Sequence, residues 1–139
     1  MKNYNNQLID KLKIHHIGVA TNSLDELTDD YLRNGYRIMN KVYDPGQKAK
    51  LVLLGKDNQD NIELISTNDP ESRVFNLSHN NYKKEYHTCF EVKNLSHFIE
   101  IFKNEGYLPI TNIEKAKLFD GKICFMYKNG NLIELVEKV

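Results

Sequence analysis

The chain has 139 residues, a length that suits one compact domain with its own hydrophobic core. Its composition, 40% hydrophobic and 27% charged residues, is that of an ordinary soluble globular protein. Nineteen basic residues balance nineteen acidic residues, which argues against a protein that binds nucleic acid or an anionic membrane. The composition therefore favours a small molecule or another protein as the partner.

Short apolar runs and two isolated cysteines indicate the cellular setting. The longest apolar runs, such as LVLL at 51–54, are too short to span a bilayer, and the start MKNYNNQLID lacks the apolar core of a signal peptide. Cys89 and Cys124 lie in apolar segments without CxxC spacing, which favours reduced core thiols over a disulfide or a zinc site. We therefore expect a cytoplasmic protein that has no contact with a membrane.

The first half of the chain predicts a strand, a helix and three more strands. A strand is expected over 13–20, and in the helix that follows Leu24 and Leu27 share one apolar face. Ser23 and Glu26 have the spacing of a capping box at the start of this helix. The three later strands are expected near residues 36–43, 49–55 and 60–66.

The second half predicts the same series of elements. A strand is expected over 85–92, followed by a helix with Asn94 as its N-cap, Leu95 and Ile99 on its apolar face and Gly106 at its end. Further strands are expected near residues 107–112, 121–127 and 131–137. The polar, turn-rich segment between the halves reads as a linker.

The two halves match each other in register. Shifting the chain by 71 positions places His16 on His87, and the tripeptide at 62–64 on the one at 133–135, without a gap. The sequence therefore predicts an α+β fold in which a βαβββ module is used twice. The expected single domain covers residues 1–139, with one module at about 13–67, a linker at 68–84 and a second module at about 85–138.

Each half carries one histidine in its first strand and one glutamate in its last strand. His16 and Glu63 are 47 positions apart, and so are His87 and Glu134. On a strand face Glu134 would lie among apolar neighbours, where a carboxylate is costly unless its charge is compensated. Two imidazoles and two carboxylates suit a divalent ion such as Zn, Ni, Co, Mn or Fe(II). We therefore take these four residues as candidate metal ligands.

The repeat helps to decide between a metal site and the ordinary structural roles of these four residues. A single strand histidine is usually a satisfied core or surface residue, and a single strand glutamate usually pairs with a lysine. Retention of one histidine and one glutamate at matching positions in both modules favours the metal site instead. Because neighbouring strand residues face opposite ways, only one of His15 and His16 can join the site, and the register selects His16.

Several motifs together resemble a known superfamily. The segments HHIGVA, IELIS, YHTCFEV and NGNLIELVE are similar to those of the vicinal oxygen chelate superfamily, over about residues 13–138. This superfamily includes glyoxalase I, methylmalonyl-CoA epimerase, extradiol dioxygenases and the bleomycin and fosfomycin resistance proteins, and the chain looks most similar to the epimerase branch. The resemblance implies a curved eight-stranded mixed sheet around one divalent metal ion per chain, usually in a homodimer, with His16, Glu63, His87 and Glu134 as ligands.

The resemblance also implies a type of chemistry and leaves the base open. In such enzymes a metal chelated by two substrate oxygens acts as a Lewis acid that stabilises an enolate, while a carboxylate moves the proton alpha to a carbonyl. The epimerases carry a glutamate base in the loop that here reads YDPGQKA, where Asp44 is the sole acid and no residue matches the glutamate. Glyoxalase I uses a metal-bound glutamate, which here would be Glu63 or Glu134. The candidate bases are therefore Glu63, Glu134 and Asp44.

Three classes of function follow from the intact ligand set. The favoured one is a metal-dependent isomerase or lyase, either epimerase-like on an acyl-CoA or glyoxalase I-like. The second is an Fe(II) ring-cleaving dioxygenase, a group that typically uses two histidines and one glutamate. The third is a metal-free small-molecule-binding or resistance protein, against which the four ligands argue. The sequence does not identify the residues that bind the substrate.

Overall fold

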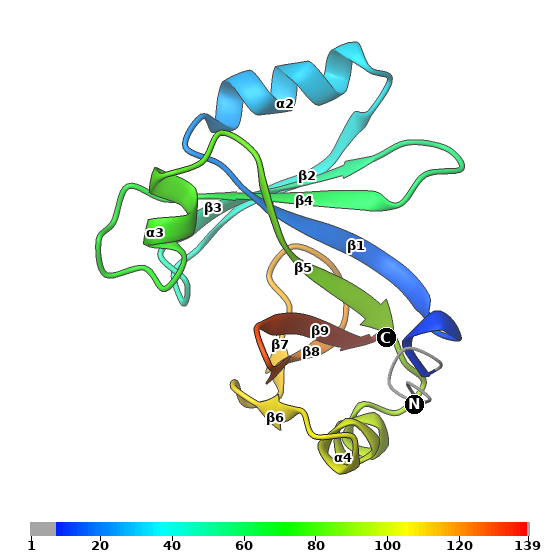
Figure 1. Ribbon diagram of the computed structural model, residues 1–139. Coiled ribbons are helices and arrows are strands. Elements are labelled where there is room, and N and C mark those ends of the chain that lie inside the picture. Colours follow the sequence, from blue (N-terminus) through cyan, green and yellow to red (C-terminus); the bar gives the residue numbers. More distant parts are fainter. Residues whose placement is uncertain (1–7, 139) are drawn as a thin grey trace. The chain divides into compact units, whose positions relative to one another are not determined.

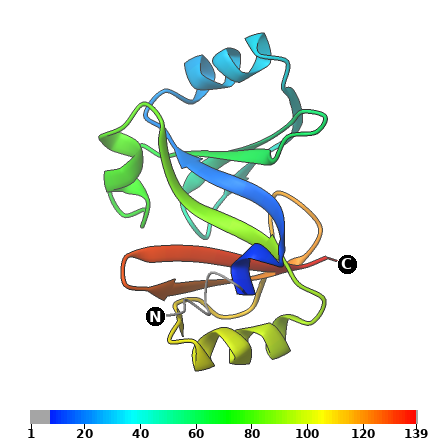
Figure 2. The same cartoon turned by 45° about the vertical axis from the view of Figure 1, so that its right-hand side comes forward.

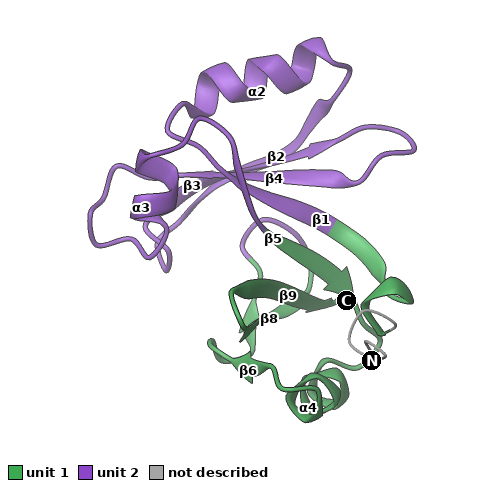
Figure 3. Ribbon diagram, viewed as in Figure 1, with its two compact units in different colours: residues 1–15, 87–116, 120–139 green, residues 16–86, 117–119 purple. Residues whose placement is uncertain are grey.

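The computed structural model describes residues 8–138, in which helices and nine strands divide between two compact units. Unit 1 comprises the described residues 8–15, 87–116 and 120–138, and unit 2 comprises residues 16–86 and 117–119 (Figure 3). The division between the units falls inside the first strand of each module. No helix in residues 8–138 is long and apolar enough to cross a membrane.

Unit 2 is built around the first βαβββ module (Figure 1). Its elements are β1 (Lys13–Ala20), α2 (Leu24–Arg33), β2 (Arg37–Asp44), β3 (Ala49–Gly55), β4 (Asn61–Ser66) and α3 (Phe75–His79). The strands pair in the order β2-β3-β4-β1, with β4 parallel to β1 and the other two pairings antiparallel.

Helix α2 packs on one face of these strands and leaves the other face to a second cluster (Figure 1). Leu27 of α2 is buried against Val52 and Leu64, which point to the helix side of the sheet. Leu53 and Ile65 point to the opposite side and belong to a separate buried cluster. The opposite side of this sheet is the one that carries Glu63, a candidate metal ligand.

Unit 1 repeats the arrangement with the second module (Figure 2). Its elements are β5 (Lys84–Glu91), α4 (Leu95–Asn104), β6 (Leu108–Pro109), β7 (Glu114–Lys115), β8 (Lys122–Lys128) and β9 (Asn131–Glu137). The strands pair in the order β5-β9-β8-β6, β9 is parallel to β5, and β7 also pairs with β8. Helix α4 buries Leu95, Ile99 and Phe102 against side chains of β8 and β9.

The predicted α+β fold with two βαβββ modules is confirmed, and most element boundaries agree within two residues. The Asn94 side chain caps α4 by accepting a hydrogen bond from the backbone N–H of His97, as expected. Gly106 follows that helix with a φ of 98°, a conformation that favours glycine. Cys89 and Cys124 are buried and form no disulfide.

Two local predictions were wrong. The capping box at α2 is absent, because Ser23 makes no side-chain cap and its Oγ donates instead to Asn22 Oδ1. Of the expected strand at 107–112 only β6 (Leu108–Pro109) forms, and a further short strand, β7 (Glu114–Lys115), follows it, which gives nine strands in the described residues where eight were expected. The predicted linker also contains a short helix, α3.

Candidate metal centre

The first histidine and glutamate of the repeat meet on adjacent strands of unit 2. Glu63 of β4 lies beside Gly18 of the parallel strand β1, so His16, two residues before Gly18, shares its face. His16 Nε2 and Glu63 Oε2 are 3.6 Å apart. Both side chains are buried, with His16 0% and Glu63 6% exposed. The structure thus brings together two of the four predicted ligands within one unit.

The second histidine and glutamate meet in the same way in unit 1. Glu134 of β9 lies beside Cys89 of the parallel strand β5, and His87 is again two residues before that partner. His87 Nε2 and Glu134 Oε1 are 3.0 Å apart, within hydrogen-bond range. His87 is 4% and Glu134 2% exposed. The internal repeat therefore extends from the sequence to the register of the parallel strands.

The spacing and chemistry of these two pairs fit ligation of a divalent ion. Two ligand atoms each ~2.1 Å from one ion lie ~3.0 Å apart in octahedral and ~3.4 Å apart in tetrahedral geometry. The observed separations of 3.0 Å and 3.6 Å are close to these values. His16, Glu63 and His87 each offer one ligand atom, and buried carboxylates such as Glu63 and Glu134 require a compensating positive charge. The donor set is therefore compatible with a metal, which would supply that charge.

Each imidazole also has an aromatic neighbour that the sequence did not predict. The Phe119 ring lies 5.5 Å from that of His16 in unit 2, and the Phe125 ring lies 5.2 Å from that of His87 in unit 1. Phe125 is also the cross-strand partner of Glu134. Phe125 could have been inferred from strand pairing, but Phe119 lies in the connection before β8, outside the strands, where strand pairing predicts no position.

Asp44, the third candidate base, holds a turn. It is buried at the end of β2, and its Oδ1 accepts a hydrogen bond from the backbone N–H of Gly46 at 2.9 Å. Its Oδ2 accepts a second one from Gln47 Nε2, also at 2.9 Å. These bonds stabilise the β2–β3 hairpin, in the manner of an aspartate at the first position of a turn.

The sheet register places Asp44 well away from Glu63. Asp44 pairs with Ala49, whereas Glu63 pairs with Leu53, four residues further along β3. Four residues of a strand span about 13 Å. Asp44 as the base stays a prediction, and the described contacts assign it a structural role in the turn.

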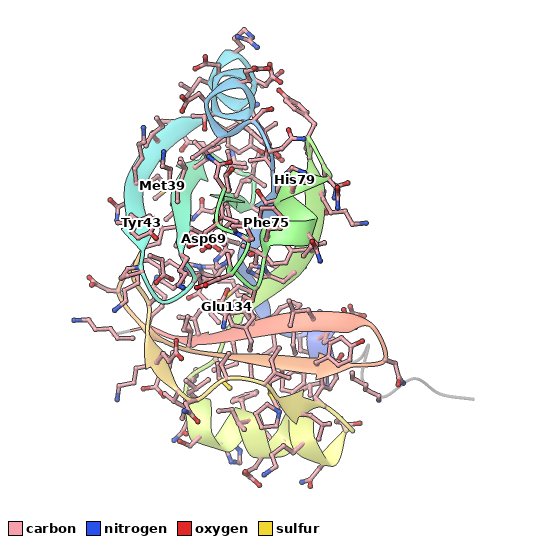
Figure 4. All side chains as sticks on the ribbon, turned by 90° about the vertical axis from the view of Figure 1, so that its left-hand side faces the viewer. Met39, Tyr43, Asp69, Phe75, His79 and Glu134 are labelled. Carbon is pink, nitrogen blue, oxygen red and sulfur yellow. The ribbon has the colours of Figure 1, made fainter. Side chains whose placement is uncertain are left out.

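The other three histidines have no counterpart at the matching position of the repeat. His15 is half-buried and precedes His16 on β1, where strand alternation directs it to the other face. His79 is exposed and its ring stacks on Phe75 of α3 at 5.0 Å (Figure 4). His97 is exposed in the first turn of α4.

Unit 2 also contains a cavity of about 450 Å³, which is separate from its His–Glu pair. Tyr43, Lys50 and Ser66 line it and are paired across β2, β3 and β4. Lys50 is two residues before Val52 and so faces the α2 side of the sheet, opposite to Glu63. Tyr43 on β2 marks this end of the sheet in Figure 4.

Comparisons with known proteins identify the fold. The profile of the glyoxalase/bleomycin resistance protein/dioxygenase superfamily matches residues 15–137. A search of curated proteins finds no match. Methylmalonyl-CoA epimerase from Mycobacterium tuberculosis is a solved structure with a TM-score of 0.81 and 20% identity, over 91% of this chain and 87% of that one.

Two further solved structures show the same likeness. A Streptomyces coelicolor methylmalonyl-CoA epimerase variant in complex with 2-nitronate-propionyl-CoA has a TM-score of 0.81 and 18% identity, over 92% of this chain and 98% of that one. A hypothetical protein from Bacillus halodurans C-125 has a TM-score of 0.79 and 22% identity, over 93% and 96%. These structures show the fold alone, and the profile match shows that the chain belongs to the glyoxalase/bleomycin resistance protein/dioxygenase superfamily.

Proposed function

We propose that the protein is a divalent-metal-dependent isomerase or lyase that moves a proton alpha to a carbonyl, with an acyl-CoA as the substrate. The observation that carries this proposal is the pair of buried His–Glu contacts, one in each unit, at 3.6 Å and 3.0 Å. A metal-free binding protein would have no use for four buried ligand-type side chains in duplicated register. The superfamily membership is consistent with an enzyme of this class.

The proposed ligands are His16, Glu63, His87 and Glu134. When bound, a divalent ion supplies a Lewis acid that polarises substrate oxygens next to the carbon that loses its proton. The imidazoles must be neutral to bind it, and the near-complete burial of all four side chains limits competition from water. These four residues would hold the ion, and an ion with a coordination number above four could also accept oxygens of the substrate.

We propose that one of the two buried glutamates is the base that removes and returns the proton. Both carboxylates are acceptors in their ionised form and lie beside an imidazole that orients them. Asp44 is the weaker candidate because both of its carboxylate oxygens already accept hydrogen bonds in the hairpin. Glu63 and Glu134 therefore have two roles in the proposal, as ligands and as candidate bases.

The acyl-CoA substrate is proposed from the structural neighbours. One epimerase was solved with 2-nitronate-propionyl-CoA and another with methylmalonyl-CoA and NH4+. A glyoxalase I-like lyase is the alternative, because this chain lacks the glutamate of the epimerase loop and retains glutamate at both carboxylate ligand positions. The homodimer implied by family resemblance stays a prediction.

The test combines metal analysis with proton exchange. Purified protein reconstituted with Zn, Ni, Co, Mn or Fe(II) is incubated in D₂O with methylmalonyl-CoA, other 2-substituted acyl-CoAs and the hemithioacetal of glutathione and methylglyoxal. We expect metal-dependent deuterium incorporation at the carbon alpha to the carbonyl, read by mass spectrometry, with one of these substrates. Glu134→Gln should weaken metal binding, because an amide is a poorer ligand for a hard cation than a carboxylate.

Three results would contradict the proposal in different ways. Consumption of O₂ with ring-opened product from a catechol would support a dioxygenase. Tight binding of a small molecule by protein that stays metal-free after reconstitution would support a binding protein. Exchange at full rate in metal-stripped protein would show that the chemistry does not need the four ligands.

A further inference from the structure

Three residues of the β7–β8 connection belong to unit 2, although their neighbours in sequence belong to unit 1. Lys117–Phe119 pack within unit 2, while Ala116 and Asp120 are part of unit 1. The backbone N–H of Ala116 donates to the carbonyl of Gly121 at 2.9 Å, so the connection is closed at its base. We call residues 117–119 the strap.

The strap is anchored to the sheet face that carries Glu63. Leu118 is 2% exposed and packs in one buried cluster with Leu53 and Ile65. Leu53 is the cross-strand partner of Glu63, so both side chains lie on the same face. Asn40 Nδ2 donates to the Leu118 carbonyl at 2.9 Å. A buried side chain and a hydrogen-bonded backbone together fix the strap on this face.

The anchored strap places Phe119 against the ring of His16. The two ring centroids are 5.5 Å apart and the planes are tilted by 56°. This separation lies in the range of attractive aromatic pairs. His16 is fully buried, and Phe119 is half-buried at the edge of the same cluster. The contact therefore restricts the rotation of the imidazole on the side of Phe119.

We propose that Phe119 is a positioning residue that holds the imidazole of His16 in the orientation needed for metal binding. This inference rests on the proposed function, in which His16 is a ligand. A histidine ligand binds tightly when its ring orientation is fixed before the metal arrives, because the ordering is then not required on binding. Phe119 fixes that ring from the second module, through three residues held in unit 2.

Phe125, which contacts the imidazole of His87, is held in place differently from Phe119. Phe125 contacts His87 from within strand β8, where its backbone is fixed by pairing with β9. Phe119 is fixed by the strap, which depends on Asn40 and on the Leu118 side chain. The orientation of His16 can therefore be altered from a distance by removing the Asn40 side chain.

The experiment compares Phe119→Ala with Phe119→Tyr and with a matched control, Leu77→Ala. Leu77 is a partly buried residue of α3 that packs against the same cluster, so its truncation removes apolar contact away from the imidazole. The first readout is the NMR signal of the His16 ring in metal-free protein. The second is the rate of Zn²⁺ release to a chelator, which we expect to rise about tenfold or more in Phe119→Ala and to recover in Phe119→Tyr.

The two readouts separate failure of this inference from failure of the proposed function. If the wild-type protein binds no metal, the proposed function fails, and the NMR signal alone decides whether Phe119 orients the ring. Unchanged His16 signals in Phe119→Ala, or Zn²⁺ release as fast in Leu77→Ala as in Phe119→Ala, would overturn the positioning role. Should Phe119→Ala not fold, Asn40→Ala is measured in its place, with the same expected rise in release and the same contrary result.

Discussion

The hydrogen bonds of Asp44 favour a structural role in the β2–β3 turn over a role as the catalytic base. Its carboxylate accepts hydrogen bonds from Gly46 and Gln47, so we expect Asp44→Asn to lower the free energy of unfolding by about 1 kcal/mol. Metal content and the rate of proton exchange should change little. Urea unfolding and exchange kinetics on the same preparation measure both quantities.

A different outcome would restore Asp44 as the base. If the variant keeps its metal and loses the rate by on the order of a hundredfold or more, the carboxylate takes part in proton transfer. That result would require the β2–β3 hairpin to rearrange when substrate binds, because the register places Asp44 far from Glu63.

A second residue-level prediction concerns a surface hydrogen bond between α2 and the segment before β5. The hydroxyl of Tyr82 donates to the Asp30 carboxylate, which lowers the pKa of Asp30 below its usual value and raises the pKa of Tyr82 to about 12. Tyr82→Phe should therefore raise the pKa of Asp30, as read by carboxyl NMR titration. Tyr43→Phe, at another exposed tyrosine, is the control and should leave Asp30 unchanged.

The sign of the pH dependence follows from these directions. The contribution of Asp30 to stability is present above its unfolded pKa and is lost as the pH falls through its lowered folded pKa. The contribution of Tyr82 is present below its unfolded pKa of about 10 and is lost as the pH rises towards 12. A titration in which Asp30 has the same pKa in wild type and Tyr82→Phe would rule out the hydrogen bond in solution.

At the scale of elements, the parallel pairing of β1 with β4 determines which histidine meets Glu63. His16 shares the face of Glu63, and strand alternation places His15 on the other face, although ring nitrogens of the two histidines lie within 4.8 Å of each other. His16→Ala should therefore abolish tight metal binding, while His15→Ala should retain nearly full metal content by elemental analysis. The reverse result would shift the strand register by one residue and remove the match between the two modules.

The helices and most strands could be predicted because each follows a strong local pattern, but some elements depend on tertiary contacts. The break between β6 and β7 arises where Thr111 Oγ1 accepts the hydrogen bond from the backbone N–H of Phe125, replacing a backbone partner. Pro109, which has no N–H, precedes this break. Neither a side-chain acceptor nor its distant donor is visible in the alternation of residues 107–112.

The short helix α3 depends on one buried hydroxyl. Ser78 Oγ donates to the carbonyl of Thr21, just after β1, and accepts from the N–H of Thr67, just after β4. Ser78→Ala leaves a buried carbonyl and N–H without this partner, and should lower the free energy of unfolding by about 1–3 kcal/mol. Asn76→Ala, at an exposed position of α3, is the matched control. Equal unfolding midpoints for the two variants in urea would contradict the role of the hydroxyl.

At the scale of the whole molecule, the internal repeat predicted the two His–Glu pairs but not the residues around them. The 71-residue shift identified His16 with His87 and Glu63 with Glu134, and the structure pairs each histidine with its own glutamate. The strap matches residues 46–48 of the β2–β3 turn under the same shift, but those residues differ from it in type, so the contact of Phe119 with His16 is not duplicated. Residues that both modules share could therefore be predicted from the sequence, whereas contacts that only one module makes could not.

The last prediction follows from counting ligands over the whole chain. Each His–Glu pair provides two donors, whereas a tightly held Zn²⁺ has at least three protein ligands. Two pairs are therefore needed for each ion, so we expect one divalent ion per chain, whether the two pairs at a site belong to one chain or to two copies. Elemental analysis of saturated protein should give one ion, and His87→Ala should abolish tight binding although the His16–Glu63 pair is intact. Affinity should fall below about pH 6, because protonated imidazoles do not coordinate. Two ions per saturated chain, with one retained in His87→Ala, would show that each pair is a separate site.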